Sequence, residues 1–516
     1  MKRHLVWCGV VLLTVAPAHA RQQAPPAPKI VLDVWDAVYL DGAKMGHQRT
    51  TVEQIERDGQ KIFHTTKLMH LTLKRYDKVV TQRMAMTSDE TPEGKVIGVS
   101  MTHYLDQGRK IVQSGRVEGD KLVVRTPTEP DGRAVPWKDG VIGLYGQEVL
   151  FKTHKIKAGD RFRFLDYQLP LLTAVPQQVV VKEMEEKDLL VAKKDGDEVK
   201  GERVRKRLLR ADVIPQKVTV GENSIALPRL AVWLDDKLRV VRQESTVPLG
   251  RMTLYRTPRT LAEKEGVAPA LMADLGLKSF IPLNRAVEHP HEVREIVYRI
   301  TVKDDDDPTT TFARDGRQKV ENVNGNTFDL RVRAVRVPVE IENPGKVKDD
   351  YLKSSYFLDS DNEKVRETAA RIAGGEKDAW RKAQRIEKWV HEHMKGNAEV
   401  NFAAASQVLN DLQGDCRQHA MLTAALCRAA RVPARTAVGL VYVNEEGRPQ
   451  LGFHMWTEVW VRGQWLMLDA VLGQGNVGAG HLKIADHSWQ DIQTLAPLLP
   501  VTRVTGKVRV EIVGVK

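Results

Sequence analysis

One cysteine, one histidine and one aspartate have the types and the order that thiol chemistry requires. Cys416 lies in Gly-Asp-Cys-Arg-Gln-His, His454 in Phe-His-Met-Trp-Thr-Glu-Val, and Asp469 ends Gln-Trp-Leu-Met-Leu-Asp. A cysteine nucleophile needs a base beside it to move a proton, and that base needs an acidic group to orient it. The three residues therefore predict a Cys-His-Asp catalytic triad.

The sequence around Cys416 predicts that the thiol stands at the start of a helix. Apolar residues of 416–430 recur at helical spacing, Val432-Pro433 ends the run, and Asp415 has a side chain favoured at an N-cap. The unpaired amides and the dipole at this end favour negative charge, so they make a thiol more nucleophilic. Cys427, three turns further along, is expected to be a buried apolar side chain.

A hairpin is expected to bring the histidine and the aspartate together. Arg462-Gly463 separates two strand-like runs and has the length of a two-residue hairpin loop. In that register Trp456 lies opposite Asp469. His454 shares the face of Trp456, so His454 and Asp469 lie on a diagonal of about 7–8 Å that one hydrogen bond spans.

Two alternatives to this arrangement stay open at the level of sequence. A three-residue loop would shift the register by one and turn Asp469 to the other face, and Glu458 is then the next candidate to orient His454. Alternatively, Cys416, His419 and His454 could ligate a metal. A separate pair of histidines, in His-Glu-His-Met at 391–394, lacks the spacing of a zinc-binding helix.

The elements that must position these residues form the C-terminal part of an α+β chain. Helices are expected over 361–372, 377–394 and 404–412, before the helix that starts at Cys416. The region before them alternates in the manner of strands, with turns at Asp41-Gly42, Asp58-Gly59 and Glu118-Gly119-Asp120. It predicts a large antiparallel sheet assembly of one or two subdomains divided near Gly140–Gly146. The expected segments are a signal peptide (1–20), a Pro-rich linker (21–29), a β-rich domain (30–262), a small β module (277–345), a catalytic domain (346–495) and a C-terminal strand (496–516).

Residues of about 350–490 resemble the transglutaminase-like superfamily, a papain-related thiol fold. The resemblance rests on 414–420, 427–435, 439–442, 452–459 and 464–469. It implies Cys416 as nucleophile, His454 as base and Asp469 as orienter, in an exported bacterial protein. Family members often have proline after the aspartate, where this chain has Ala470.

The expected reaction is acyl transfer on a peptide or carboxamide, with hydrolysis favoured over amine transfer. The alternatives are protein-glutamine transglutaminase chemistry and an inactive binding module of the cell envelope. The amide of Cys416 is one expected oxyanion donor, and Gln407 and Gln413 are candidates for the second. No cofactor or metal is expected, because Asp304–Asp307 lacks the spaced oxygens and the glycine of a calcium loop.

Composition and the N-terminal segment indicate where the protein is located and which partners it can have. The chain has 516 residues and a formal charge of +12, and no motif or basic aromatic stripe points to nucleic acid. Lys2-Arg3, an apolar stretch and Ala18-His19-Ala20 predict a cleaved leader, so the mature protein is expected to be periplasmic or secreted, with no transmembrane segment. Cleavage removes Cys8 and leaves Cys416 and Cys427, which are too far apart on one helix to form a disulfide. The expected partner is a peptide or protein substrate.

Overall fold

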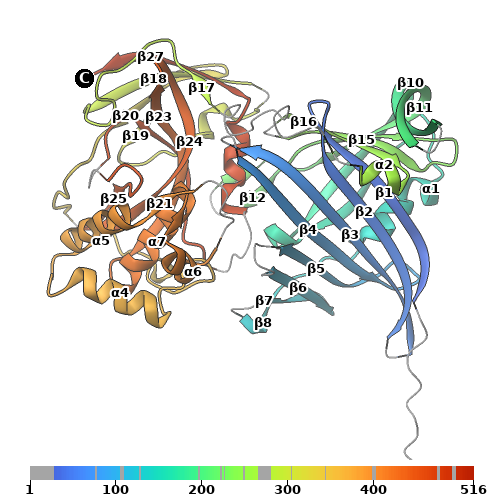
Figure 1. The fold of residues 1–516 in the computed structure, drawn as a ribbon, viewed down its shortest axis with the longest axis horizontal. Coiled ribbons are helices and arrows are strands. Elements are labelled where there is room, and N and C mark those ends of the chain that lie inside the picture. The colour runs from blue at the N-terminus through green and yellow to red at the C-terminus, as the bar shows by residue number, and fades with distance from the viewer. Residues whose placement is uncertain are drawn as a thin grey trace, which may run out of the picture.

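The computed structural model describes most of the chain from Pro28 to Lys516. The expected leader and most of the expected linker lie outside the described residues. Figure 1 shows a β-rich N-terminal part beside a C-terminal part of helices and strands, as expected for an α+β chain. The described residues are 28–57, 59–75, 78–104, 110–126, 129–195, 198–220, 223–225, 227–247, 250–264, 266, 280–303, 305–342, 345–397, 403–473, 477–490 and 496–516.

The N-terminal part is one antiparallel sheet of 14 strands. Its order is β8-β7-β6-β5-β4-β3-β2-β1-β16-β15-β14-β11-β10-β9, so strands on both sides of Gly140–Gly146 belong to a single sheet. Pairing of β1 with β16 joins the two halves. The strands are β1 (Lys29–Leu40), β2 (Ala43–Arg57), β3 (Gln60–Arg75), β4 (Lys78–Glu90), β5 (Val96–Tyr104), β6 (Lys110–Glu118), β7 (Lys121–Thr126), β8 (Glu129–Pro136), β9 (Arg161–Gln168), β10 (Thr173–Asp195), β11 (Glu198–Pro215), β14 (Leu230–Leu234), β15 (Val240–Val247) and β16 (Gly250–Thr257).

Residues 230–247 contain two strands, β14 and β15, because Asp235 accepts hydrogen bonds from the backbone of Lys237 and Arg239 and turns the chain. The helix α1 (Leu144–His154) was not expected. Its apolar periodicity is weak, and no side chain of its own caps its first turn.

A buried carboxylate on the neighbouring strand β4 replaces the missing cap of α1. Glu90 is 0% exposed and accepts hydrogen bonds from the amides of Tyr145 (2.8 Å) and Gly146 (2.9 Å). Ser88 accepts the amide of Leu144 at 2.9 Å. Anionic and hydroxyl acceptors satisfy the free amides at a helix start, so these bonds fix α1 against the inside of the sheet.

The large sheet curls until its two ends meet. Val141, just after β8, forms a bridge with Leu165 of β9, and the amide of Ile142 donates to the Leu165 carbonyl at 3.0 Å. Apolar residues from both ends then share one buried cluster with Trp137 and Leu169. The curled sheet thereby encloses an interior that α1 partly fills.

The C-terminal part places four helices against a second antiparallel sheet of order β17-β24-β23-β26, with β25 also paired to β24. The four helices were expected from the sequence, and each begins or ends within about two residues of the predicted position. The elements are α4 (Glu363–Ala373), α5 (Ala379–His393), α6 (Ala405–Asp411), α7 (Cys416–Ala429), β17 (Ile281–Pro282), β23 (Ala434–Glu445), β24 (Arg448–Val461), β25 (Gln464–Leu468) and β26 (His481–His487).

The C-terminal strand of the chain pairs with the small β module. Its sheet has the order β19-β20-β18-β27, with β18 (Glu295–Val302), β19 (Gln318–Asn324), β20 (Thr327–Arg333) and β27 (Val508–Val515). The strand β20 ends at Arg333. After β16 the short helix α2 (Arg259–Ala262) follows, and most of residues 263–279 lie outside the described residues.

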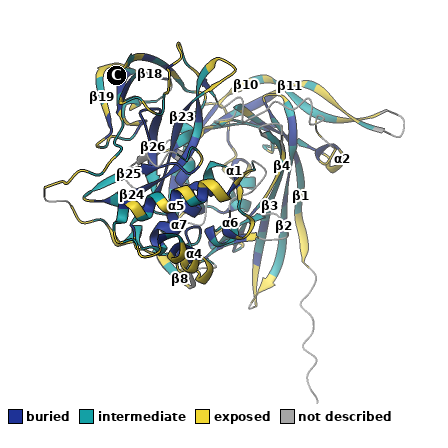
Figure 2. Ribbon diagram, turned by 60° about the vertical axis from the view of Figure 1, so that its left-hand side comes forward, coloured by how far each residue is buried: buried dark blue, intermediate teal, exposed yellow. Residues whose placement is uncertain are grey.

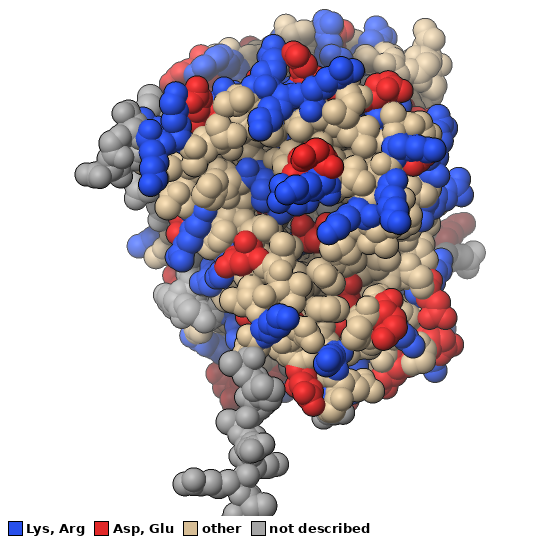
Figure 3. Space-filling model, turned by 90° about the vertical axis from the view of Figure 1, so that its right-hand side faces the viewer, with Lys and Arg blue, Asp and Glu red and all other residues tan. Residues whose placement is uncertain are grey.

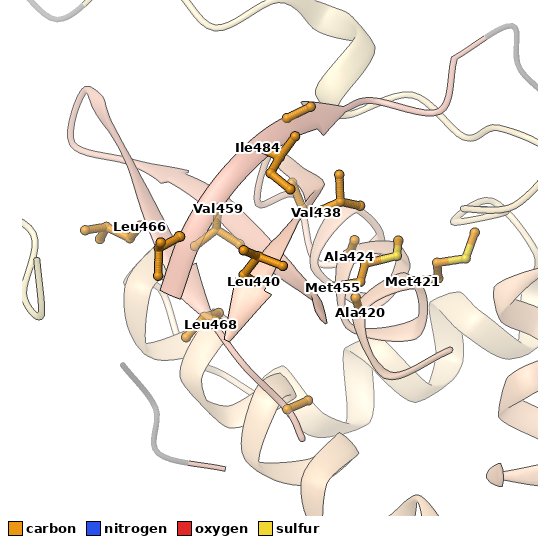
Figure 4. Close-up of a cluster of buried hydrophobic side chains, with 14 of the residues drawn as sticks. Ala420, Met421, Ala424, Val438, Leu440, Met455, Val459, Leu466, Leu468 and Ile484 are labelled. Carbon is orange, nitrogen blue, oxygen red and sulfur yellow. The ribbon is translucent and has the colours of Figure 1, made fainter. Parts of the chain in front are cut away.

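One apolar core runs through the small β sheet, the second sheet and the helices. Figure 4 shows Ala420 and Ala424 of α7 beside side chains of the sheet, among them Met455. Buried residues concentrate in α7 and the strands behind it (Figure 2). Cys427 lies in this core at 0% exposure, as expected.

The charged stretch at Lys182–Arg210 forms the long hairpin β10–β11. Opposite charges pair across it, for example Arg205 with Asp188 at 3.1 Å. Figure 3 shows basic and acidic side chains interspersed over the face that it draws, on the β-rich side of the molecule. Among the described residues, no helix has the length and apolarity needed to cross a membrane.

Candidate active site

Cys416 is the first residue of α7, and the residues before it fix the helix start. Asp415 is the N-cap, and its carboxylate accepts the amide of Arg417 at 2.9 Å. Gln418 returns the bond by accepting the amide of Asp415 at 3.1 Å, which completes a capping box. Gly414 has to be glycine, because any Cβ there would overlap the Gln418 side chain.

The body of α7 is anchored to the sheet that carries the histidine. The helix packs on β24 and against α4, α5 and α6. Thr457 of β24 donates its hydroxyl to the carbonyl of Ala420 at 2.8 Å. At the other end, the buried Arg428 donates to the carbonyls of Ala434 and Ser488. These bonds hold the sulfur of Cys416, which is half-buried, at a fixed height over the sheet.

The hairpin has the register that the two-residue loop predicts. Val461 pairs with Gln464 and Thr457 with Leu468, and Arg462-Gly463 forms the turn. Asp469 follows directly after β25, so the register extended by one residue places it beside Trp456. The alternative with a three-residue loop is therefore wrong.

The structure brings Cys416, His454 and Asp469 together. The His454 Nε2 and Asp469 Oδ2 atoms are 2.7 Å apart, and the two residues are 6% and 2% exposed. The side chain of Cys416 is close enough to His454 to raise the pKa of its ring. Because Nε2 is engaged by the carboxylate, Nδ1 is the ring nitrogen left to face the sulfur.

Burial and charge set the protonation of the two central groups. Burial by itself lowers the pKa of His454, but the Asp469 carboxylate outweighs it, and the raised pKa is about 10. Burial by itself raises the pKa of Asp469, but His454 and His481 hold that pKa well below its usual range. At neutral pH the pair is therefore an imidazolium and a carboxylate.

His481, which the sequence did not single out, also binds Asp469. Its Nε2 lies 2.9 Å from the same Oδ2 atom, and the residue is 0% exposed. Burial lowers the pKa of His481 to about 4, despite the neighbouring carboxylate. His481 starts β26, which pairs with β23, so no local spacing rule relates it to Asp469. The ring of Trp456 packs near both histidines, with its centroid 6.2 Å from that of His454 and 5.2 Å from that of His481.

Glu458, the other candidate orienter, has different partners. It shares the face of His454 along β24, but its Oε2 accepts from Arg435 at 2.7 Å and from Lys483 at 2.8 Å. Burial by itself raises the pKa of Glu458, and the two cations outweigh it and lower the pKa to about 2. Asp486 completes this buried charge cluster by pairing with both cations. The carboxylate that contacts His454 is that of Asp469.

Three side chains near the site have the spacing of metal ligands, but they are not the set of Cys416, His419 and His454 that the sequence left open as an alternative. Among the described residues, the ligand atoms of His454, Asp469 and His481 lie within 4.8 Å of one another. Cys416 and His419 do not belong to this group. His419 instead donates from Nδ1 to the carbonyl of Asp415 at 2.8 Å and helps hold the helix start. A cation bound by the three side chains would displace the protons that now join both rings to the carboxylate.

The comparison with protein families identifies one domain in the C-terminal part of the chain. The Transglutaminase-like superfamily matches residues 366–470, a range that contains Cys416, His454 and Asp469. These residues form a transglutaminase-like domain. His481 lies beyond the matched range. The comparison with the curated proteins finds no match.

The comparison with solved structures finds matches of low sequence identity and low TM-score. A putative cysteine protease from Cytophaga hutchinsonii is 17% identical, with 42% of this chain and 83% of that chain covered and a TM-score of 0.29. A beta-barrel-like protein of a domain of unknown function from Brucella abortus is 14% identical, covers 44% and 97% of the two chains, and has a TM-score of 0.30. A putative protease from Parabacteroides distasonis is 9% identical, covers 77% and 65%, and has a TM-score of 0.19.

Proposed function

We propose that the protein is an exported thiol enzyme that hydrolyses peptide or carboxamide bonds through Cys416, His454 and Asp469. One observation carries this proposal: the Nε2 atom of His454 lies 2.7 Å from Oδ2 of Asp469, and the thiol at the start of α7 is close enough to His454 to raise its pKa. The same constellation in the same order serves acyl transfer on several folds. The transglutaminase-like domain supports the class of reaction.

The first half of the reaction makes a thioester. The Cys416 thiolate attacks the carbonyl carbon of the substrate, and the electron pair of the carbonyl moves to oxygen. The amide of Cys416 and the positive end of α7 stabilise that oxyanion. His454 then gives its Nδ1 proton to the leaving nitrogen, the carbon–nitrogen bond breaks, and the amine or ammonia departs.

The second half returns the enzyme to its starting state. Water gives a proton to Nδ1 of His454 as its oxygen attacks the thioester carbon. The carbon–sulfur bond breaks, the acid leaves, and the thiolate again faces an imidazolium. If a primary amine reaches the thioester in place of water, an amide forms and the reaction is amine transfer. Asp469 keeps its negative charge in every step and holds the ring in position.

Labelling and product analysis test the proposal. Protein that begins at Arg21, and therefore lacks Cys8, is treated with fluorescent iodoacetamide and, separately, with glutamine-containing and cell-wall peptides in ¹⁸O water, with and without dansylcadaverine. Labelling that Cys416→Ala abolishes and Cys427→Ala retains is expected, together with one ¹⁸O atom in each new acid. Amine incorporation without ¹⁸O would favour the transglutaminase reaction. Equal labelling of Cys416→Ala, or no Cys416-dependent product from the panel, would contradict the proposal.

The exported location is part of the same proposal and has its own test. It rests on the basic start, the apolar stretch and Ala18-His19-Ala20 before Arg21. N-terminal sequencing of the protein purified from the periplasm or the medium of a bacterial host is expected to begin at Arg21. Retention of an uncleaved chain in the cytosol would contradict it.

A further inference from the structure

The curled sheet of the N-terminal part contains two neighbouring cavities that the transglutaminase-like chemistry does not use. One has a volume of about 510 Å³ and lies between β4, β5, β9 and the start of α1. The other has about 270 Å³ and lies between the far side of α1 and β10, β11 and β14. The larger cavity falls within the range of about 300–1,000 Å³ that is usual for small-molecule sites.

Apolar side chains form the two ends of this space. Met84, Met86 and Met101 line the larger cavity with Val96 and Val99. Leu150 and Phe151 of α1 and Phe164 of β9 line the smaller one. Methionine is flexible and polarizable and adapts to apolar ligands of irregular shape. Both ends therefore suit hydrocarbon.

Polar side chains gather where the two cavities meet. We call this region the waist; its residues line both cavities and are Lys67, Gln147, Asp166, Gln168, Leu227 and Gln243. Asp166 accepts from Gln147 Nε2 at 3.0 Å and also from Gln168. The two amides are thus oriented by the carboxylate, and each keeps a carbonyl oxygen as a free acceptor.

Two further glutamines flank the waist without partners of their own. Gln48 lines the larger cavity and is 7% exposed, and Gln177 lines the smaller cavity and is 6% exposed. Within the part of the chain that the structure describes, neither side-chain amide makes a hydrogen bond. An amide that lines a cavity and has no protein partner offers both its N–H and its C=O, so a ligand that bonds both has an advantage here.

The charged groups around the waist form ion pairs, and the remaining acid, Asp166, accepts from two glutamine amides while burial raises its pKa and so favours its neutral form. Lys67 pairs with Glu148 at 3.2 Å, and Arg256 pairs with Glu148 at 3.5 Å and with Asp36 at 2.8 Å. A ligand with a formal charge would have no free counter-charge among these pairs and would lose its hydration on entry. The amide-lined waist between apolar ends instead fits a neutral hydrogen-bonding group on an apolar chain.

We propose that the interior of the N-terminal sheet is a binding site for a neutral amphiphile, in which an apolar chain lies among Met84, Met86 and Met101 and an amide-type head bonds Gln48 and the waist. The site lies in the β-rich part and involves no step at Cys416. Its occupancy is therefore independent of the proposed reaction.

Competition with a fluorescent probe tests the site. Full-length protein is loaded with N-phenyl-1-naphthylamine, which fluoresces in apolar surroundings. Three dodecyl ligands below their micelle concentrations then compete: N-dodecanoylglycinamide, dodecanoate and dodecyltrimethylammonium. The neutral amide is expected to displace the probe at a concentration at least 10-fold lower than either charged ligand. Equal displacement by all three, or no probe binding, would overturn the proposal.

Variants locate the binding within the molecule. Met101→Trp fills the larger cavity and is expected to weaken probe binding at least 10-fold, whereas Met184→Trp, on the surface of β10 with the residue 43% exposed, leaves binding unchanged. Gln48→Leu keeps the space but removes the amide, so it is expected to retain the probe and lose most of the preference for the neutral head. Probe binding that Met101→Trp leaves intact, or a preference that Gln48→Leu leaves intact, would show that the cavity is not the site.

Discussion

His454 and His481 donate hydrogen bonds to the same atom, Oδ2 of Asp469, at 2.7 and 2.9 Å. Their pKa values nevertheless move in opposite directions, to about 10 for His454 and to about 4 for His481. Burial opposes charge on both rings, and one carboxylate offsets that cost for one imidazolium only. His454 also has Cys416 beside it, so the charge resides there.

This division of roles gives Asp469 two fixed donors. His481 is neutral and holds its proton on Nε2, and its Nδ1 is buried without a hydrogen-bond partner among the described residues. The carboxylate is therefore positioned by a group that does not titrate near neutral pH. We infer that His481 is a positioning residue, which acts on His454 through Asp469.

Replacing Asp469 by asparagine is expected to lower kcat by about 10²- to 10⁴-fold, because the neutral amide no longer stabilises the imidazolium. The titration of His454 is expected to move from about pH 10 toward 6.5. NMR of the histidine rings measures the titration, and turnover of a peptide substrate measures kcat. Asp411→Asn, at the exposed end of α6, is the control and should change neither.

Stability is expected to fall below pH 6.5 because of His481. Its folded pKa of about 4 is below the unfolded value of about 6.5, so within this window the unfolded chain binds a proton that the folded chain does not. The loss reaches about 3 kcal/mol near pH 4. In His481→Phe this contribution disappears. Urea unfolding at several pH values measures the free energy of unfolding. The same dependence of this free energy on pH in His481→Phe would contradict the assignment. His289→Phe, at a side chain that is 77% exposed, is the control.

Glu458→Gln is expected to destabilise the fold by about 3–5 kcal/mol, because it leaves the buried Arg435 and Lys483 without their shared carboxylate. Asp486 remains but is only partly buried. Below the unfolding temperature, the rate at which iodoacetamide labels Cys416 should stay the same in Glu458→Gln. A slower rate is expected only if Glu458 orients His454. The exposed pair Glu446–Arg448 provides the control: Glu446→Gln should cost less than about 1 kcal/mol.

Asp415→Ala is expected to cost about 1 kcal/mol or more of stability and to slow the labelling of Cys416, because the helix start that presents the sulfur loses its N-cap. Asp415→Asn should retain most of both, since asparagine caps equally well. Asn362→Ala removes the N-cap of α4 and is the matched control. It should cost similar stability in thermal unfolding and leave labelling unchanged; equal labelling in Asp415→Ala would contradict the prediction.

The sequence by itself determined the parts of the site that depend on near neighbours. Asp415 before Cys416 indicates a capped helix start, and the two residues between Val461 and Gln464 set the hairpin register. Both follow from contacts within a few residues, where spacing and residue type decide the geometry. Residue types and spacing alone were therefore enough to assign His454 and Asp469 to one face of the hairpin.

Only the tertiary structure decided which distant groups meet that face. His481 contacts Asp469 because β26 pairs with β23. Glu458 does not contact His454, because its carboxylate binds Arg435 and Lys483. In the N-terminal part, Glu90 caps α1 from a strand more than 50 residues away in sequence. Such pairings depend on long-range strand order and on where buried charges find partners. No local pattern encodes either, so the cavity and the second histidine appear only in the folded chain.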